Sequence, residues 1–418
     1  MLRILLPLLL FGLLSSVLPR NSQAQDAQSY AASGVQKVKA GRNEEALQDF
    51  NKAIELAPSE AVHYRNRAAL YARMKAWDKA AADYTSVLGL QPDPNIQLSR
   101  GYCYVQLGKL DEALADFDAV LNKEGDNERA LRARAYIFEK KKEPQRAAED
   151  LTKLLAKNPN DEAALKSRAA CYATSGKWEQ AAADYGRLVE LDPNNADAQS
   201  ALAASYLHTG DKAAALKALD GVLRVKANDP DALLLRAKLY SEQGKLDEAL
   251  SDYTKAIELK PDDAELYSGR GYARIKKGDK PGAVADFSKA IELNPQDLSH
   301  YSARTYLYES SGEPAKAIED LGHLIAAKPE DSQLLLRRGD LYLLLKKPDD
   351  AIKDYDAVLR REPDNAVALS GKGQAIAQKG DRRAGAELLR KALELAKDPK
   401  LQEAIRQKLH ELGVGPLL

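Results

Sequence analysis

The sequence predicts an all-α solenoid, in which pairs of helices stack one after another along the chain. The first observation is a ladder of alanines in which every step is 34 residues except one of 33. The second is that apolar residues follow these alanines by four and by seven positions, the spacing of one helix face. A fixed period of this length is typical of repeat proteins. The ladder consists of Ala46, Ala80, Ala113, Ala147, Ala181, Ala215, Ala249, Ala283, Ala317 and Ala351.

Each repeat unit is predicted to hold two helices joined by a tight turn. The first helix carries a small residue and often a tyrosine three positions later, as at Ala68 and Tyr71. An aromatic residue or leucine follows each alanine of the second helix by four positions, and a proline usually ends the unit. An Asp or Asn often comes two residues after that proline, where it can accept a hydrogen bond from a free N–H group of the next helix. These predicted caps are Asp161, Asn195, Asp263, Asp297, Asp331 and Asn365.

With these alanine, aromatic, small and proline residues at fixed positions of each repeat, the chain resembles the tetratricopeptide repeat proteins. Their helical hairpin has a small residue at position 8, an aromatic at 11, alanine at 20 and 27, an aromatic at 24 and proline at 32. The resemblance implies a right-handed superhelical solenoid of antiparallel helix-turn-helix repeats, and one continuous array is the simplest interpretation. In this register the eleven repeats are residues 27–60, 61–93, 94–127, 128–161, 162–195, 196–229, 230–263, 264–297, 298–331, 332–365 and 366–398.

Several repeats depart from this pattern. Gly125 and Ala227 stand where the closing proline belongs, Arg274 replaces the tyrosine of the eighth repeat, and Gly385 replaces the alanine of the last. Residues 399–418 follow the last repeat, and 399–412 (PKLQEAIRQKLHEL) have the pattern of an amphipathic helix. We expect this helix to cap the apolar face of the last hairpin.

The N-terminus has the features of a signal peptide over residues 1–24. One arginine precedes about fifteen mostly apolar residues, and small residues at Ser22 and Ala24 suit cleavage after Ala24. The alternative is an uncleaved anchor, which the shortness of the apolar run disfavours, because a membrane span needs about 20 residues. We expect an exported protein, periplasmic or secreted.

Composition excludes several classes of function. The 62 basic and 62 acidic residues give zero formal charge, so no overall field points to nucleic acid or to an anionic membrane. The two cysteines, Cys103 and Cys171, lie two repeats apart, too far for a disulfide, and are expected in the core. The five histidines include no pair at metal-ligand spacing, and no nucleophile or phosphate-binding motif is found. We therefore expect no catalysis, metal or cofactor.

A second ladder pairs arginine at position 7 with aspartate at position 23. Both residues occur together in eight repeats, and the sixth repeat loses both, having Leu202 and Ala218. This joint loss indicates pairing within one repeat, although Asp49 of the first repeat has only Ser33 at position 7. We interpret the pairs as architecture, because a charge left alone between packed helices is costly. The arginines are Arg67, Arg100, Arg134, Arg168, Arg236, Arg270, Arg304 and Arg338.

The resemblance implies that a partner protein or peptide binds along the concave surface, at positions 2, 5, 9, 12 and 13 of the repeats. Tyrosine, a good contact anchor, occupies position 9 in two adjacent pairs of repeats. The alternative is that these tyrosines only shield their neighbours. The hypothetical groove residues are Arg65, Arg73, Tyr102, Arg132, Tyr136, Lys166, Tyr272 and Tyr306.

Charge at these positions changes along the chain. Cations prevail in the first five repeats and carboxylates in the later ones, which suggests a groove with a basic and an acidic half. The alternative is chance variation on a solvated surface. The cations are Lys39, Arg65, Arg73, Arg129, Arg132, Lys140 and Lys166, against Glu139. The carboxylates are Asp197, Asp231, Glu242, Glu265, Glu309 and Asp340, against Lys238 and Lys276.

These observations predict a noncatalytic, exported scaffold or adaptor that holds partner proteins or peptides. The alternative is a binder of a non-protein envelope component, such as a polysaccharide or a cell-wall fragment. The sequence gives no indication of the partner's identity or of the oligomeric state.

Overall fold

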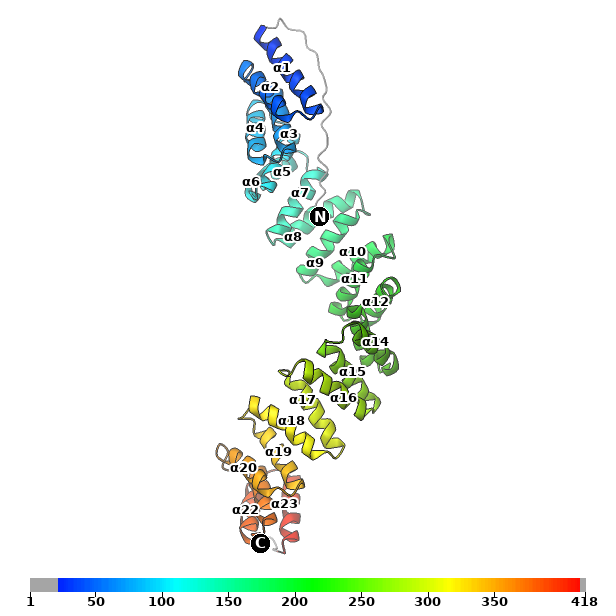
Figure 1. Cartoon of the computed structure of the whole chain (residues 1–418), viewed down its shortest axis with the longest axis vertical. Coiled ribbons are helices and arrows are strands. Elements are labelled where there is room, and N and C mark those ends of the chain that lie inside the picture. Colours follow the sequence, from blue (N-terminus) through cyan, green and yellow to red (C-terminus); the bar gives the residue numbers. More distant parts are fainter. Residues whose placement is uncertain (1–21, 414–418) are drawn as a thin grey trace. The chain divides into compact units, whose positions relative to one another are not determined.

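The computed structural model describes residues 22–413, a range that holds 23 α-helices joined by turns and short connectors (Figure 1). The helices pair into hairpins with one odd helix at the end, so the predicted all-α solenoid is confirmed. Residues 1–21 of the expected signal peptide lie outside the described range. The chain divides into two compact units, Met1–Gly210 and Asp211–Leu418, where the sequence suggested one array. The division falls in the sixth repeat, whose sequence lacks both residues of the arginine–aspartate ladder.

The described part of the first unit, residues 22–210, contains eleven helices. Each odd-numbered helix from α3 to α9 begins at the first position of a predicted repeat, whereas α1 begins five residues earlier than Ala27. Their bounds are α1 Ser22–Lys39, α2 Asn43–Leu56, α3 Ala61–Arg73, α4 Trp77–Leu90, α5 Pro94–Gln106, α6 Leu110–Lys123, α7 Glu128–Lys140, α8 Pro144–Lys157, α9 Glu162–Thr174, α10 Trp178–Leu191 and α11 Ala196–Thr209.

Residues 211–413 of the second unit contain twelve helices, the last of which is the helix expected after the final repeat. This helix, α23, packs against α22 and α21 and buries Ile405 and Leu409 in the same core cluster as Leu389. The bounds are α12 Lys212–Val225, α13 Pro230–Glu242, α14 Leu246–Leu259, α15 Ala264–Lys277, α16 Lys280–Leu293, α17 Leu298–Ser310, α18 Pro314–Ala327, α19 Ser332–Leu344, α20 Pro348–Leu359, α21 Ala366–Gln378, α22 Arg382–Leu395 and α23 Pro399–Glu411.

Many of the first helices of the repeats begin where the sequence supplies a cap. All six predicted capping residues accept a hydrogen bond from a backbone N–H group of the first turn, as Asp161 does from Ala164 at 2.9 Å. Proline occupies the first turn of α5, α8 and α13, where its missing N–H group needs no partner. Local chemistry therefore sets the start of these helices before packing is considered.

The alanine ladder marks the places where the two helices of a hairpin are packed most tightly. Every alanine of the ladder is fully buried. The small residue at position 8 serves the same packing, because a Cβ atom on Gly101 would lie 2.7 Å from the ring of Phe117. The large aromatic at position 24 thus requires the small residue opposite it, which explains why both recur with the same period.

The arginine–aspartate pairs lie within single repeats, as predicted. Arg168 donates to Asp184 from Nε at 2.8 Å and from Nη2 at 2.7 Å, and the other seven pairs also join Nε and Nη2 to the carboxylate. The aspartates are buried, and about a fifth or less of each arginine side chain is exposed. The pairing is therefore two-pronged and largely removed from water.

A further bond, which was not predicted from the sequence, ties seven of the eight arginines to the preceding repeat. The Nη1 atom of Arg134 donates to Asp118 at 2.6 Å, and that of Arg236 donates to Asp220 at 2.7 Å. Five other arginines donate in the same way to a residue on the second helix of the repeat before. These acceptors are Asn51, Thr85, Thr152, Thr254 and Ser288.

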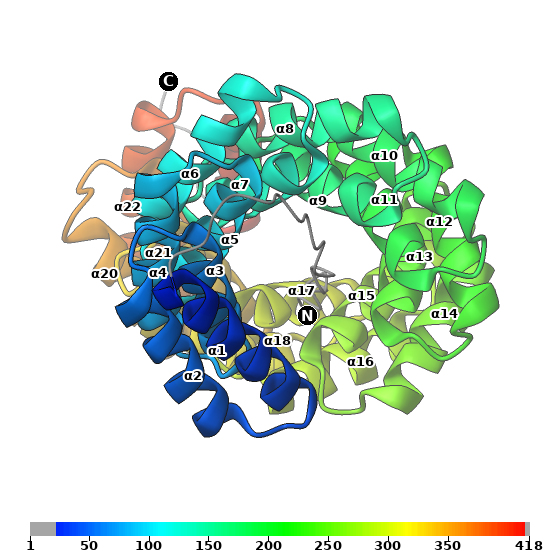
Figure 2. The same ribbon diagram turned by 90° about the horizontal axis from the view of Figure 1, so that it is seen from above.

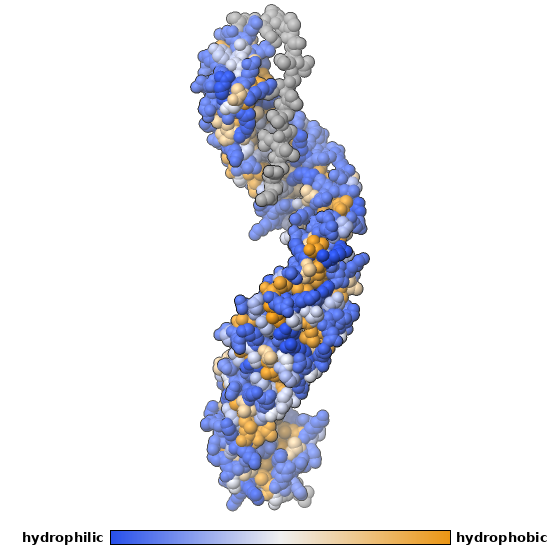
Figure 3. Space-filling model, turned by 45° about the vertical axis from the view of Figure 1, so that its right-hand side comes forward, coloured by the Kyte–Doolittle hydropathy of each residue, from blue (hydrophilic) through white to orange (hydrophobic). Residues whose placement is uncertain are grey.

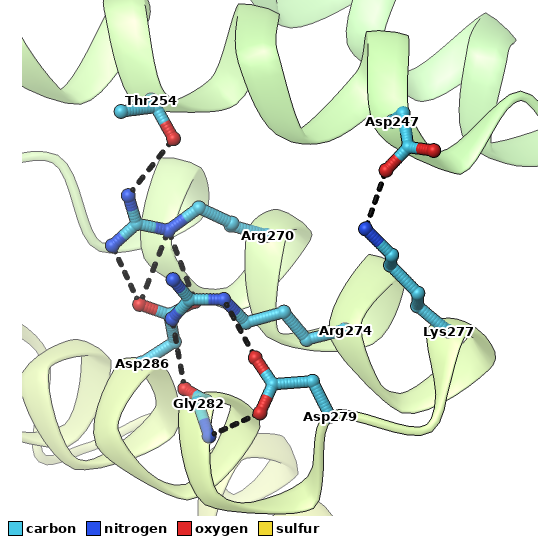
Figure 4. Close-up of polar contacts among 8 residues, drawn as sticks. All are labelled: Asp247, Thr254, Arg270, Arg274, Lys277, Asp279, Gly282 and Asp286. Carbon is cyan, nitrogen blue, oxygen red and sulfur yellow. Dashed lines mark hydrogen bonds and ion pairs between the residues drawn. The ribbon is translucent and has the colours of Figure 1, made fainter.

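The eighth repeat shows why Arg274 can replace the usual tyrosine. In other repeats the aromatic ring at this position lies beside the guanidinium, as Tyr172 lies 5.7 Å from Arg168. Arg274 instead donates to Asp286 at 2.8 Å and to the carbonyl oxygen of Gly282 at 3.0 Å (Figure 4). Asp286 therefore binds two arginines, Arg270 and Arg274.

The ladder changes at the ends of the chain. In the first repeat the hydroxyl group of Ser33 donates to Asp49 at 2.6 Å, and Lys37 pairs with the same carboxylate. In the last repeat Lys372 takes the place of the arginine and pairs only with Asp356 of the repeat before, at 2.6 Å. The first repeat thus keeps the half within its own hairpin, and the last keeps the bond to the preceding repeat, because Leu388 stands where its aspartate would be.

Most turns within the hairpins use glycine in the left-handed region, but three use lysine. Lys75, Lys142 and Lys346 have φ angles of 60°, 60° and 56°, whereas Gly176 at the equivalent position has 71°. A side chain with a Cβ atom is strained in this conformation. These three turns therefore carry a local energetic cost that the glycine turns avoid.

Removing one partner of the ladder should cost more than removing both. Asp184→Ala leaves the Arg168 guanidinium without its carboxylate, so we expect the free energy of unfolding to fall by about 3 kcal/mol. The double variant Arg168→Leu with Asp184→Ala copies Leu202 and Ala218 of the sixth repeat and should lose less. Denaturant unfolding followed by circular dichroism measures both, and an equal or greater loss in the double variant would contradict the prediction.

Relieving a strained turn should stabilise the protein. Lys142→Gly removes the Cβ strain at a φ of 60°, and we expect a gain of about 1 kcal/mol in the free energy of unfolding. Gly176→Lys is the matched reverse change and should lose a similar amount. If the melting temperature fell in Lys142→Gly and rose in Gly176→Lys, the strain argument would be wrong.

Candidate binding surfaces

The odd-numbered helices form the inner side of each unit. In the first unit α5, α7 and α9 face the inside of the curve and α6, α8 and α10 the outside, and in the second unit α13 and α15 lie inside α14 and α16 (Figure 2). Successive odd-numbered helices also contact one another, as α5 does α7 and α13 does α15. We call positions 2, 5, 9, 12 and 13 of the repeats the inner positions.

In the first unit two tyrosines stand among cations. Tyr102 of α5 packs the edge of its ring on the buried Phe117, with centroids 5.5 Å apart, and its hydroxyl group donates to the carbonyl oxygen of Arg129 at 3.4 Å. Burial raises the pKa of Tyr102, whereas the nearby Arg129 and Arg132 act to lower it. Tyr136 of α7 has the ammonium group of Lys140 5.4 Å from its ring centre.

The cations of the first unit fall into two groups. Arg132 pairs with Asp161 at 2.5 Å, and Arg73 donates to Asn43 and to the carbonyl oxygen of Val38, so these two arginines tie neighbouring hairpins together. Lys140 lies over the ring of Tyr136, and the charged groups of the remaining four are exposed and have no ion-pair or hydrogen-bond partner among residues 22–413. They are Lys39, Arg65, Arg129 and Lys166. We define the basic patch as Tyr102, Arg129, Arg132, Tyr136 and Lys166.

The carboxylates of the second unit do not leave an acidic face. Five of the six carboxylates named from the sequence lie in this unit, and each has a partner there. Glu309 binds Arg337 through two bonds of 2.7 and 2.6 Å, Glu265 pairs with Lys238, and Asp340 accepts from the hydroxyl group of Tyr355 at 2.7 Å. Asp231 pairs with Lys260 and Glu242 with Lys212. The expected acidic half is therefore largely neutralised within the protein.

These ties cannot be recognised from the residue types at the inner positions alone. Three of the five partners come from neighbouring repeats and stand 27 to 30 residues away, as Lys238 does from Glu265. A search for opposite charges at that spacing would have found them. The hypothetical groove tyrosines of this unit are nevertheless open to solvent, with 46% of Tyr272 and 57% of Tyr306 exposed.

Comparison with protein families agrees with this geometry. Models described as tetratricopeptide repeat match residues 33–95, 98–162, 172–239, 264–297, 305–366 and 345–401, and one described as TPR repeat matches 237–278. One of these models alone spans more than half of the chain. The chain belongs to the tetratricopeptide repeat family.

Individual relatives share only part of this repeat protein. A small glutamine-rich tetratricopeptide repeat-containing protein of Saccharomyces cerevisiae is 36% identical over 101 residues, which are 24% of this chain and 29% of that protein. A rat mitochondrial import receptor subunit is 32% identical over 117 residues, 26% of this chain and 19% of that protein. The chain thus spans less than a third of these relatives. The crystal structure of yeast Tom70 aligns over 94% of this chain and 96% of its own, with 18% identity and a TM-score of 0.33.

As a tetratricopeptide repeat protein, the chain is a scaffold for protein–protein interactions.

The two cysteines are free and buried. Burial raises the pKa of the Cys103 thiol to about 12 and contributes most to raising the pKa of the Cys171 thiol to about 11. Among residues 22–413 no three His, Cys, Asp or Glu side chains are placed to hold a metal ion. No described helix is long and apolar enough to span a membrane.

Proposed function

We propose that the protein is a noncatalytic adaptor whose first unit holds an acidic peptide segment of a partner protein on the basic patch. The observation that carries this proposal is the presence of exposed cations whose charged groups have no partner within residues 22–413. Arg129 and Lys166 are exposed and unpaired, while Glu139 is the one acid at the inner positions of the first five repeats. A partner's carboxylates would supply the missing counter-charges.

The tyrosines of the basic patch give such a segment a firm support. Tyr102 is held by Phe117 and by the carbonyl oxygen of Arg129, so little side-chain freedom is lost when a partner packs on its ring. Arg132 is fixed by Asp161, the residue that caps α9. Side chains that are already ordered lower the entropic cost of binding. The patch thus combines ordered rings with free charge.

Reversing the free charges should weaken binding of an acidic peptide. The probe is a fluorescently labelled peptide of alternating Asp and Ala, with a Lys-and-Ala peptide as its counterpart. We expect the acidic peptide to bind the full chain, to bind more weakly as salt rises, and to lose about tenfold or more in affinity in Arg129→Glu with Lys166→Glu. Fluorescence anisotropy measures the dissociation constants.

A matched control carries the same charge change on the outer helices. Lys123 of α6 and Lys153 of α8 are exposed and unpaired within residues 22–413, so Lys123→Glu with Lys153→Glu should bind the acidic peptide almost as the unaltered chain does. Equal losses in the two double variants would show only a net-charge effect. Binding that changes neither with salt nor in Arg129→Glu with Lys166→Glu would contradict the proposal and would favour a neutral glycan as the ligand.

We also propose that the protein is exported and that residues 1–24 are removed. The support is the apolar N-terminal run followed by small residues at Ser22 and Ala24. Helix α1 begins at Ser22, so cleavage after Ala24 removes only its first three residues and keeps the buried Ala27. Mass spectrometry of the protein from the periplasm or the medium should give a chain that starts at Gln25. An intact N-terminus in a membrane fraction would show an anchor instead.

A further inference from the structure

The second unit has a small cleft on its inner side, between α13 and α15. Its volume is about 300 Å³. The rings of Tyr253 and Tyr272 line it together with Gly269 and Ala273, and charged residues surround it. Apolar surface enclosed by a polar rim is the form that binding hot spots take at protein interfaces.

A glycine allows an aromatic ring to reach this cleft. Tyr253 belongs to α14 and is buried, and its ring passes beside the backbone of α15 at Gly269. A Cβ atom at Gly269 would lie 2.6 Å from Cε1 of Tyr253, so no larger residue fits without moving the ring. Burial raises the pKa of Tyr253 to about 12 and keeps the phenol neutral. The cleft therefore contains an aromatic surface that carries no charge.

Tyr272, the exposed tyrosine of the cleft, is held in place by a buried aromatic ring. The edge of the Tyr272 ring packs on the fully buried Phe287, with centroids 5.0 Å apart and the planes at 77°. Nearly half of Tyr272 nevertheless remains exposed, and Tyr306 occupies the same position in the next repeat with still more of its surface in water. A fixed and exposed ring offers contact area at a low entropic cost.

Most of the charges around the cleft are already neutralised. Lys238 pairs with Glu265, Glu242 pairs with Lys212, and the ammonium group of Lys276 is hydrogen-bonded to the carbonyl oxygen of Ser241 at 3.0 Å. Unlike Arg129 and Lys166 of the basic patch, Lys238, Glu242 and Glu265 therefore require no counter-charge from a partner. A charged ligand would therefore gain little here, and an apolar one would not strand an unpaired ion.

Other exposed apolar residues stand at inner positions farther along the same unit. Leu344 at position 13 of the tenth repeat is 68% exposed, and Val367 at position 2 of the eleventh is 41% exposed. Figure 3 likewise shows orange, hydrophobic patches on the surface of the second unit, in the lower half of the view. The inner side of this unit thus differs in character from the basic patch.

We propose that this cleft is an anchor site for one bulky apolar side chain of a partner peptide whose flanking residues are uncharged. The peptide packs on Tyr272 and continues over Tyr306. This inference rests on the proposed role as a protein-binding scaffold, but it uses a different surface from the basic patch. The protein would then recognise acidic segments with its first unit and apolar ones with its second.

The test starts from a displayed library of short random peptides selected against the full chain at high salt, which suppresses binding to the basic patch. We expect the selected peptides to share a bulky apolar residue at one position. For a synthetic copy of one such peptide, Tyr272→Ala should raise the dissociation constant about tenfold, and Tyr306→Ala should raise it less. Tyr272→Phe keeps the ring and should bind nearly as well as the unaltered chain.

The controls separate this inference from the proposal for the first unit. Arg129→Glu with Lys166→Glu should not change binding of the apolar peptide, and Tyr102→Ala, a tyrosine at the same position of another repeat, should not either. Circular dichroism and melting temperature must show that each variant is folded. The inference is overturned if no apolar peptide is selected, or if folded Tyr272→Ala and Tyr306→Ala variants bind it as before. Loss of acidic-peptide binding on reversal of the basic patch would then still support the proposed function.

Discussion

The architecture depends on a guanidinium group that is bonded to two other helices at once. Each ladder arginine projects from the first helix of its repeat and binds the aspartate of the second helix through two parallel bonds, as in Arg134 with Asp150. In seven repeats its remaining nitrogen reaches the second helix of the preceding repeat. Apolar contacts between hairpins are numerous but have no direction. The arginine supplies a directional bond that fixes how one hairpin is placed on the next.

Much of this architecture could be predicted from the sequence because its causes are local and repeated. The alanine period identified the hairpins, and the joint loss at Leu202 and Ala218 indicated which charges belong together. The bond from the arginine to the preceding repeat could not be predicted in this way. Arg236 stands 16 residues from both Asp220 and Asp252, and the preceding acceptor varies among Asn, Asp, Thr and Ser, so no single residue type marks it.

The binding surfaces could be predicted only in part, and for a physical reason. Residue type and period place Tyr102, Tyr272 and Arg132 at inner positions, but they do not determine which long side chains are already occupied. Arg132 is bound by Asp161 and Glu309 by Arg337, whereas Arg129 and Lys166 are unpaired within residues 22–413. The number of charged residues at the inner positions does not distinguish paired from unpaired side chains. When the paired side chains are left out of the comparison, the first unit has unpaired cations at its inner positions and the second has exposed tyrosine rings.

The one-way pattern of the ladder bears on how such a chain can change in length. Seven of the interior repeats join an arginine to an acceptor of the repeat before, and each terminal repeat keeps one half of the motif, as Ser33 with Asp49 and Lys372 with Asp356 show. A duplicate of one of these seven hairpins therefore brings its own arginine and its own aspartate, and leaves no buried carboxylate alone. A gene that gains such whole repeats preserves the ladder.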